Sequence, residues 1–161
     1  MIRIGMIIII AVIIVSITVG NYYYYENQPD LKITKSGEPV MVGSILYDIE
    51  YIGNHNGNED KRPKNTYFEI RIFAEQKGTE PTRISGGQFY LLDENDVKVQ
   101  PDYGEFTEED LLQAKLEPNK PISRTTQFDI KFDDSAKYRI GILATKEQHS
   151  RDIGIICVKN C

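Results

Sequence analysis

Two cysteines near the C-terminus are the residues of this sequence with the clearest covalent chemistry. Cys157 and Cys161 are separated by three residues, and the chain has no other cysteine. A four-residue offset in a straight strand holds the Cα atoms about 13 Å apart, whereas a disulfide needs less than about 7 Å. A bridge therefore requires a turn at residues 158–160. An internal disulfide, two free thiols, and an intermolecular or metal-binding role all stay open.

Carboxylates are dense between residues 93 and 110, and carboxylate oxygens are the ligands that calcium prefers. The candidate calcium ligands are Asp93, Asp96 and Asp102. The spacing of an EF-hand loop is missing, however. Tight turns and acids at the start of a helix explain the same residues. We therefore expect no metal and no other cofactor, with calcium kept as a weak alternative.

The remaining reactive residue types predict no active site. His55 and His149 lie in polar segments, and neither has a partner at the spacing of a metal site or a catalytic triad. The Gly86–Gly87 pair is not followed by the Lys-Ser/Thr of a phosphate-binding loop. We expect that the protein is not an enzyme.

An apolar segment at the N-terminus indicates where the protein works. Ile4 to Val19 carries no charge and, with its neighbours, approaches the roughly 20 residues that a helix needs to cross a bilayer. Four tyrosines follow this segment: Tyr22, Tyr23, Tyr24 and Tyr25. Tyrosine suits the membrane interface because its ring tolerates lipid while its hydroxyl prefers water. We interpret residues 1–25 as a membrane anchor with an interfacial tyrosine belt.

The charges around the anchor predict its direction. Arg3 precedes the apolar segment, and Glu26 and Asp30 follow it. The positive-inside rule then places the N-terminus in the cytoplasm and residues 26–161 outside. The alternative is a signal peptide cleaved near Gly20. That alternative would give a secreted protein and leave the domain outside the cytoplasm as well.

Behind the anchor, the sequence alternates between apolar and polar residues as half-buried strands do. In residues 66–76, for example, Phe68, Ile70 and Ile72 share one face. The expected strands are 44–52, 66–76, 88–92, 97–100, 122–132, 138–144 and 153–158. About seven or eight strands, with turns roughly every ten residues, predict an all-β fold built as an antiparallel sandwich.

One short helix and two boundaries complete the expected organisation. Thr107 is a favourable N-cap, and the acids that follow it suit the first turn of a helix over Glu108–Ala114. Residues 26–38 have no strong periodicity and are expected to form a spacer. The sandwich domain is expected to occupy residues 39–161.

Four stretches combine core strands with recurrent turns: NTYFEIRIFAEQKGTEP (Asn65–Pro81), FYLLDEND (Phe89–Asp96), LEPNKPISRTTQFDI (Leu116–Ile130) and KYRIGI (Lys137–Ile142). In these stretches the chain resembles the DUF4352 family of bacterial and archaeal surface proteins, over Gly37–Ile142. It departs from the family at Asp96 and Asn119, where glycine is frequent. The resemblance implies an immunoglobulin-like sandwich used for binding, adhesion or support outside the cytoplasm, and it transfers no functional residue.

The net charge of −5 makes nucleic acid an unexpected partner, because nucleic-acid binding requires clustered lysine and arginine. We expect a non-catalytic, membrane-anchored module that binds a protein or a cell-envelope polymer through loops or an edge strand. The alternative is a sensor or carrier that binds a solute or a metal and works with a membrane partner. An enclosed apolar pocket with converging polar groups would favour that alternative, and shallow grooves would favour the first hypothesis.

Overall fold

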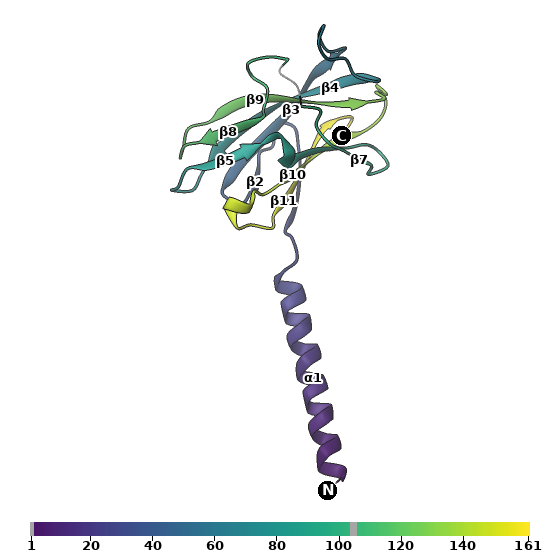
Figure 1. Cartoon of the computed structure of the whole chain (residues 1–161), viewed down its shortest axis with the longest axis vertical. Coiled ribbons are helices and arrows are strands. Elements are labelled where there is room, and N and C mark those ends of the chain that lie inside the picture. Colours follow the sequence, from purple (N-terminus) through teal and green to yellow (C-terminus); the bar gives the residue numbers. More distant parts are fainter. Residues whose placement is uncertain (1, 104–105) are drawn as a thin grey trace.

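The computed structural model describes residues 2–103 and 106–161. A long helix, α1 (Ile2–Glu26), stands below a β-domain, and the two are joined by a short extended segment (Figure 1). Residues Ile8–Glu26 are long and apolar enough to cross a membrane, and none of this stretch is buried against the rest of the protein. Such a helix near the N-terminus is consistent with a membrane anchor or with a signal sequence.

The β-domain contains eleven strands among the described residues. They are β1 (Leu31–Lys35), β2 (Val40–Val42), β3 (Ile45–His55), β4 (Thr66–Gln76), β5 (Thr82–Ser85), β6 (Phe89–Leu92), β7 (Lys98–Val99), β8 (Gln113–Leu116), β9 (Ile122–Ile130), β10 (Tyr138–Leu143) and β11 (Ile153–Lys159). Two short 3-10 helices, η1 (Gly86–Gln88) and η2 (Lys146–Gln148), lie between strands. The predicted all-β fold is confirmed.

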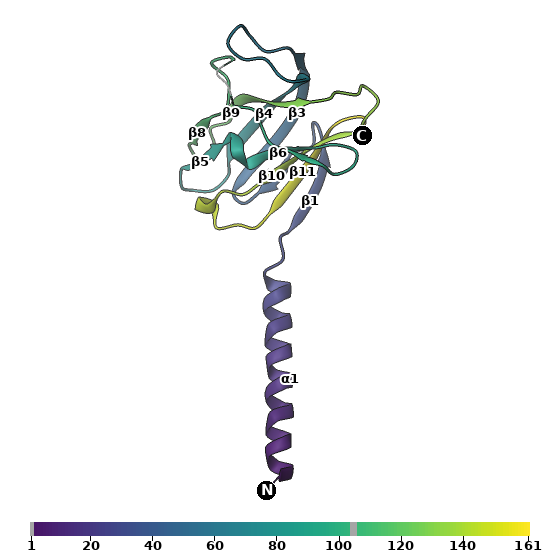
Figure 2. The same ribbon diagram turned by 45° about the vertical axis from the view of Figure 1, so that its right-hand side comes forward.

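Two main sheets pack face to face, as Figure 2 shows. Sheet A has the strand order β1-β11-β10-β6-β7, and sheet B has the order β2-β3-β4-β9. β5 and β8 form a separate pair. Alternate residues of the long strands point between the sheets, so that Ile49, Ile70, Phe128 and Ile140 are fully buried. These side chains belong to one hydrophobic core, which is the principal stabilising contact of a sandwich.

The structure corrects the expected boundary between spacer and domain. β1 lies inside the residues 26–38 that were expected to be a spacer, and it pairs with β11 from Leu31↔Ile153 to Lys35↔Cys157. The sandwich therefore begins at Leu31 rather than at residue 39. The sequence predicted an antiparallel sandwich. The β1–β11 pair is parallel, whereas the other neighbouring strands of the two main sheets are antiparallel. A parallel neighbour is possible here because the two strands come from opposite ends of the chain.

The predicted helix over Glu108–Ala114 is wrong. Asp110 instead forms an isolated bridge with Thr125 of β9, and Gln113–Leu116 is strand β8. The Asp110 carboxylate accepts a hydrogen bond from the backbone of Phe106 (2.6 Å) and one from the Thr125 hydroxyl (3.1 Å). Two long-range backbone bonds hold the segment along the edge of β9. The Leu111 N–H donates to the Thr125 carbonyl oxygen (2.8 Å), and the Thr125 N–H donates to the Glu109 carbonyl oxygen (2.9 Å). They replace the local bonds of a helix.

Candidate functional site

Strand directions decide which end of the sandwich lies far from α1. β1 starts close to the end of α1 and runs away from it (Figure 2). β11 is parallel to β1, β10 is antiparallel to β11, and β6 is antiparallel to β10. The start of β10 at Tyr138 and the end of β6 at Leu92 therefore lie at the end remote from the anchor. We call this end the distal end.

A groove of about 720 Å³ opens at the distal end, between the β6–β7 turn and the β9–β10 connection. Its apolar lining residues are Leu91, Val99, Ile130, Phe132, Ala136 and Tyr138. Its polar lining residues are Asp93, Glu94, Asn95, Asp129, Lys131, Asp133 and Asp134. We call this surface the distal groove. An apolar floor with five carboxylates and one lysine among the lining residues suits a ligand that is both apolar and positively charged.

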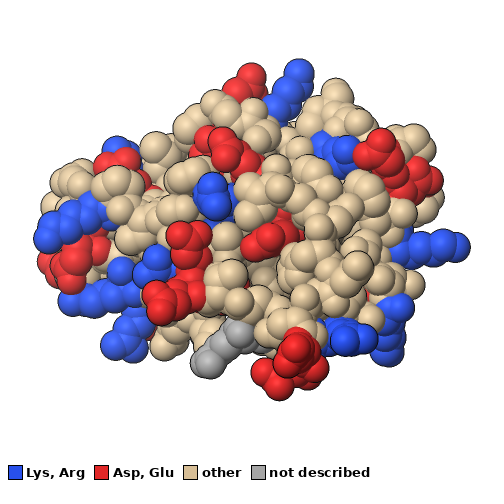
Figure 3. All heavy atoms as spheres, turned by 90° about the horizontal axis from the view of Figure 1, so that it is seen from above, with Lys and Arg blue, Asp and Glu red and all other residues tan. Residues whose placement is uncertain are grey.

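Local hydrogen bonds favour the ionised form of two rim acids, Asp129 and Asp133. The Asp129 carboxylate accepts bonds from the backbone N–H groups of Lys64 (2.6 Å) and Asn65 (3.0 Å). Burial alone would raise the pKa of Asp129, but these bonds outweigh it and hold the pKa below its usual range. Bonds from Ser135 likewise lower the pKa of Asp133. The rim is thus negatively charged at neutral pH. Figure 3 views the molecule from above and shows acidic and basic side chains interspersed over this surface.

An aromatic cluster supports the floor of the distal groove. The rings of Phe132 and Tyr138 are stacked at a centroid distance of 5.7 Å, and the ring of Phe68 lies 5.0 Å from that of Tyr138. Tyr51 stacks on Phe68 at 4.4 Å. The Lys159 ammonium lies 5.4 Å from the Tyr51 ring centroid and 5.6 Å from that of Phe132. Contacts of this kind give the floor a rigid shape.

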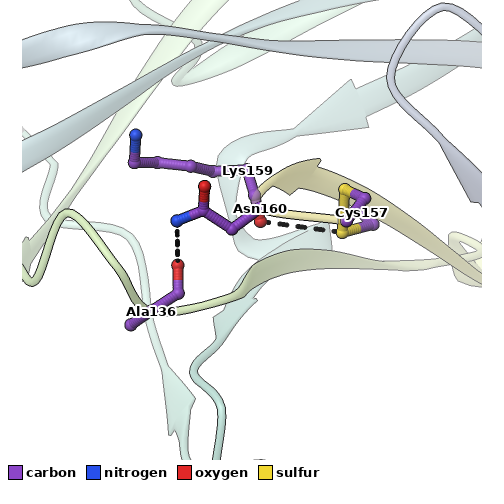
Figure 4. The surroundings of a disulfide bond; sticks show 5 residues. Ala136, Cys157, Lys159 and Asn160 are labelled. Carbon is purple, nitrogen blue, oxygen red and sulfur yellow. Dashed lines mark hydrogen bonds between the residues drawn. A yellow bond between two sulfur atoms is a disulfide. The ribbon is translucent and has the colours of Figure 1, made fainter.

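A disulfide loop at the C-terminus packs against the same region. The structure joins Cys157 and Cys161, whose Cα atoms are 5.9 Å apart. The turn that this requires occurs at Asn160, which has a left-handed backbone (φ 53°). The Asn160 side chain donates hydrogen bonds to the carbonyl oxygens of Asp134 (2.7 Å) and Ala136 (2.8 Å). Figure 4 shows this loop held against Ala136.

Lys159 belongs to the same loop and reaches the rim of the groove. Its ammonium pairs with Asp134 at 2.9 Å, and this hydrogen bond raises the pKa of Lys159. Neither Lys159 nor Asn160 was predicted as a site residue. Their position between the two cysteines is the only sequence signal that marks them.

The three calcium candidates do not converge on one site. Asp93 accepts hydrogen bonds from the backbone N–H groups of Asn95 and Val97, each at 2.8 Å, within its own turn. Asp96 pairs with Arg139 at 2.6 Å. Asp102 pairs with Lys61 and accepts a bond from the Tyr67 hydroxyl at 2.8 Å. In residues 2–103 and 106–161, no three His, Cys, Asp or Glu side chains are grouped to hold a metal.

The two histidines lie away from the distal groove lining. His55 packs against Tyr67 and Phe106, with centroid distances of 5.0 and 5.5 Å. This cluster covers the outer face of sheet B, and burial raises the pKa of Tyr67. His149 ends η2 in a left-handed conformation (φ 47°). The four tyrosines of the predicted interfacial belt are exposed near the end of α1, close to the β-domain.

Solved structures with the same fold come from bacterial proteins. The yjhA protein from Bacillus subtilis is 17% identical with a TM-score of 0.59, and the match covers 78% of this chain and 99% of that one. The secreted protein MPT63 from Mycobacterium tuberculosis is 8% identical with a TM-score of 0.59, covering 81% and 98%. A putative lipoprotein (ycdA) from Bacillus subtilis is 11% identical with a TM-score of 0.56, covering 75% and 38%.

At these identities the likeness concerns the fold alone, and it supports the β-sandwich architecture of this domain. No curated protein matches the chain in sequence. The family model described as a domain of unknown function, DUF4352, matches residues 34–148, which include most of both sheets. This confirms the resemblance, and the chain belongs to the DUF4352 family.

Proposed function

We propose that this protein is a membrane-tethered, non-catalytic binding module that works outside the cytoplasm. It takes a cationic, partly apolar segment of a protein partner into the distal groove. The observation that carries the proposal is the groove itself, whose apolar floor is bordered by five carboxylates and only two lysines, Lys131 and Lys159. Because binding partners carry complementary charge across an interface, the acidic rim would attract a positively charged partner and repel a negatively charged one.

Two features support the location outside the cytoplasm. The positive charge of Arg3 precedes the apolar helix and acids follow it, which is the pattern of an anchor whose C-terminal domain faces out. The disulfide between Cys157 and Cys161 suits an oxidising compartment. The distal groove then lies outside the cytoplasm, within reach of a partner in the envelope or on the cell surface.

A small-solute carrier is supported less well than a macromolecular binder. Sites for small molecules enclose most of the ligand surface, whereas the distal groove is a broad hollow open to solvent. An extended polypeptide segment can lie in such a groove and place alternate side chains on the floor and against the rim.

The test uses the full chain in nanodiscs of zwitterionic lipid and a fluorescent peptide of alternating lysine and leucine. Fluorescence anisotropy should show binding that weakens with added salt, because exposed charges are screened. Glu94→Lys reverses one exposed rim charge and should weaken binding about tenfold. Glu80→Lys makes the same charge change away from the groove. Glu80 follows Gln76, the last residue of β4, whereas the first residue, Thr66, pairs with Ile130 of the groove. This variant should leave binding unchanged. Absence of binding, or equal loss in both variants, would contradict the proposal.

A further inference from the structure

The part of the outer face of sheet A nearer the anchor is apolar although it faces solvent, whereas Lys35 and Arg139 lie on the part farther from the anchor. Leu31 and Ile33 of β1 are 53% and 66% exposed, and they lie beside Ile153 and Ile155 of β11. Leu143 of β10 pairs with Ile153 and is 38% exposed. The alternate residues of these strands, such as Ile142 and Ile156, point into the core. We call the five outward residues, Leu31, Ile33, Leu143, Ile153 and Ile155, the sheet A face.

β1 has the reverse of the usual pattern for a strand at the edge of a sandwich, which buries apolar residues and exposes polar ones. Here Leu31 and Ile33 point outward, while the Thr34 hydroxyl is buried. Lys32 bonds to the Met41 carbonyl oxygen (3.1 Å) and pairs with Asp152 (3.3 Å). Since a one-residue shift would invert every side chain, the observed register with β11 keeps the apolar side chains of β1 on the surface.

Neighbouring residues set the limit of this surface. The Tyr90 ring of β6 lies directly over Gly141 of β10, which also pairs with Ile155 of β11. Tyr90 itself is only 5% exposed, and the Lys98 ammonium lies 4.4 Å from its ring centroid. The sheet A face therefore spans β1, β11 and β10 and ends before β6.

Lipid cannot cover this face while the anchor stands upright. The helix from Gly20 to Glu26 raises the domain about 9 Å above the apolar segment. The extended segment from Glu26 to Leu31 can add at most about 16 Å more. The headgroup layer is only about 5–8 Å thick on each side. Arg151 also donates a hydrogen bond to the Asn27 carbonyl oxygen (2.8 Å), which ties the domain to the end of α1. The face thus stands above the headgroups. Figure 2 shows β1 and β11 above the end of α1.

We infer that the sheet A face binds the same face of a second copy of this chain, with both anchors in one membrane. Two copies with the same anchor hold their faces at the same height and in the same orientation. A two-fold axis along the membrane normal then brings the faces together without moving either anchor out of the bilayer.

The size of the face indicates that this association depends on the anchor. Three strands spaced about 4.8 Å apart, each contributing about five residues, cover roughly 240 Å² per copy. A stable interface in solution buries about 800 Å² per partner. Confinement to one membrane raises the effective concentration enough to favour a contact of this smaller size.

The test places single cysteines on the full chain in proteoliposomes and adds a short bismaleimide. Leu143→Cys lies on the sheet A face, and Phe73→Cys lies on the outer face of sheet B with nearly equal exposure, 38% against 36%. We expect a cross-linked dimer for Leu143→Cys and only monomer for Phe73→Cys. Adding Ile33→Asp to Leu143→Cys should lower the cross-linked fraction about fivefold or more, since it places like charges at the contact.

Circular dichroism should show an unchanged fold for Ile33→Asp, because the side chain is mostly exposed. Equal cross-linking at both cysteines, no cross-linking at Leu143→Cys, or no effect of Ile33→Asp would overturn the inference. Cross-linking of Leu143→Cys to a different protein in intact cells, without the dimer, would overturn it as well. Peptide binding in the distal groove is measured separately, so either proposal can fail alone.

Discussion

The C-terminal disulfide loop yields the most quantitative prediction. Cys161→Ser removes the bridge at the exposed cysteine and keeps the buried Cys157 side chain. The bond closes a loop of five residues, for which the chain-entropy model gives about 7 cal/mol/K, or about 2 kcal/mol at 25 °C. For a domain of this size, that loss lowers Tm by roughly 8 °C. Thermal unfolding of the full chain in detergent, followed by circular dichroism, measures it.

The same loop predicts a coupling between two substitutions. Asn160→Gly removes the hydrogen bonds to Asp134 and Ala136 and tolerates the left-handed backbone at this position. Alone it should cost about 1 kcal/mol. In the Cys161→Ser background it should cost much less, because the loop no longer holds residue 160 in place. Reduction of the wild-type protein should reproduce the Tm of Cys161→Ser.

An unchanged Tm for Cys161→Ser would refute the view that the bond fastens this loop to the distal end. Fully additive effects of Cys161→Ser and Asn160→Gly would refute the proposed coupling. Both results are read from the same unfolding curves.

Three further predictions concern the core, the sheet A face and pH. Phe68→Ala should cost about 3–5 kcal/mol in urea unfolding, since Phe68 is fully buried. Gly141→Ala should destabilise by about 1–3 kcal/mol through overlap with the Tyr90 ring, and Tyr90→Ala should relieve most of that cost. Burial disfavours the Asp152 carboxylate, but the Gly43 N–H and the Lys32 ammonium outweigh it and lower its pKa. Asp152→Asn should therefore reduce stability at pH 7 but not near pH 2.

The sign of the pH effect follows from the direction of the pKa shift. A folded-state pKa below the unfolded value, about 3.9 for aspartate, stabilises the protein above that pH. The contribution is lost as pH falls through the folded-state pKa. A stability difference between wild type and Asp152→Asn that grew in acid would contradict this reasoning. For the glycine, a Gly141→Ala cost that Tyr90→Ala leaves unchanged would contradict the proposed overlap.

Strands with strict alternation could be predicted from sequence because one face is buried and the other is not. β4 begins and ends at the predicted residues, Thr66 and Gln76. β5 and β8 were missed, since each has four residues and a short strand carries little periodicity. The false helix over Glu108–Ala114 had correct local signals, and the bridge from Asp110 to Thr125 overrode them through a long-range contact.

The distal groove was beyond sequence reasoning for a related reason. Of the acids at its rim, Asp93 and Glu94 belong to the acidic stretch that was attributed to turns, and Asp93 and Asp133 do cap their own turns. Nothing local indicates that the turn at Asp93 and the connection at Asp133 face each other across an apolar floor. That arrangement depends on which strands form the edges of the two sheets, and strand order is set by contacts between distant residues.

Labelling of Glu94→Cys in intact cells tests the central claim most directly, because it asks whether the distal groove is open on the outer side of the membrane. A membrane-impermeant maleimide should label Glu94→Cys without permeabilisation and leave the wild-type chain, whose cysteines are joined, unlabelled. Labelling of Glu94→Cys only after the cells are lysed would contradict the account.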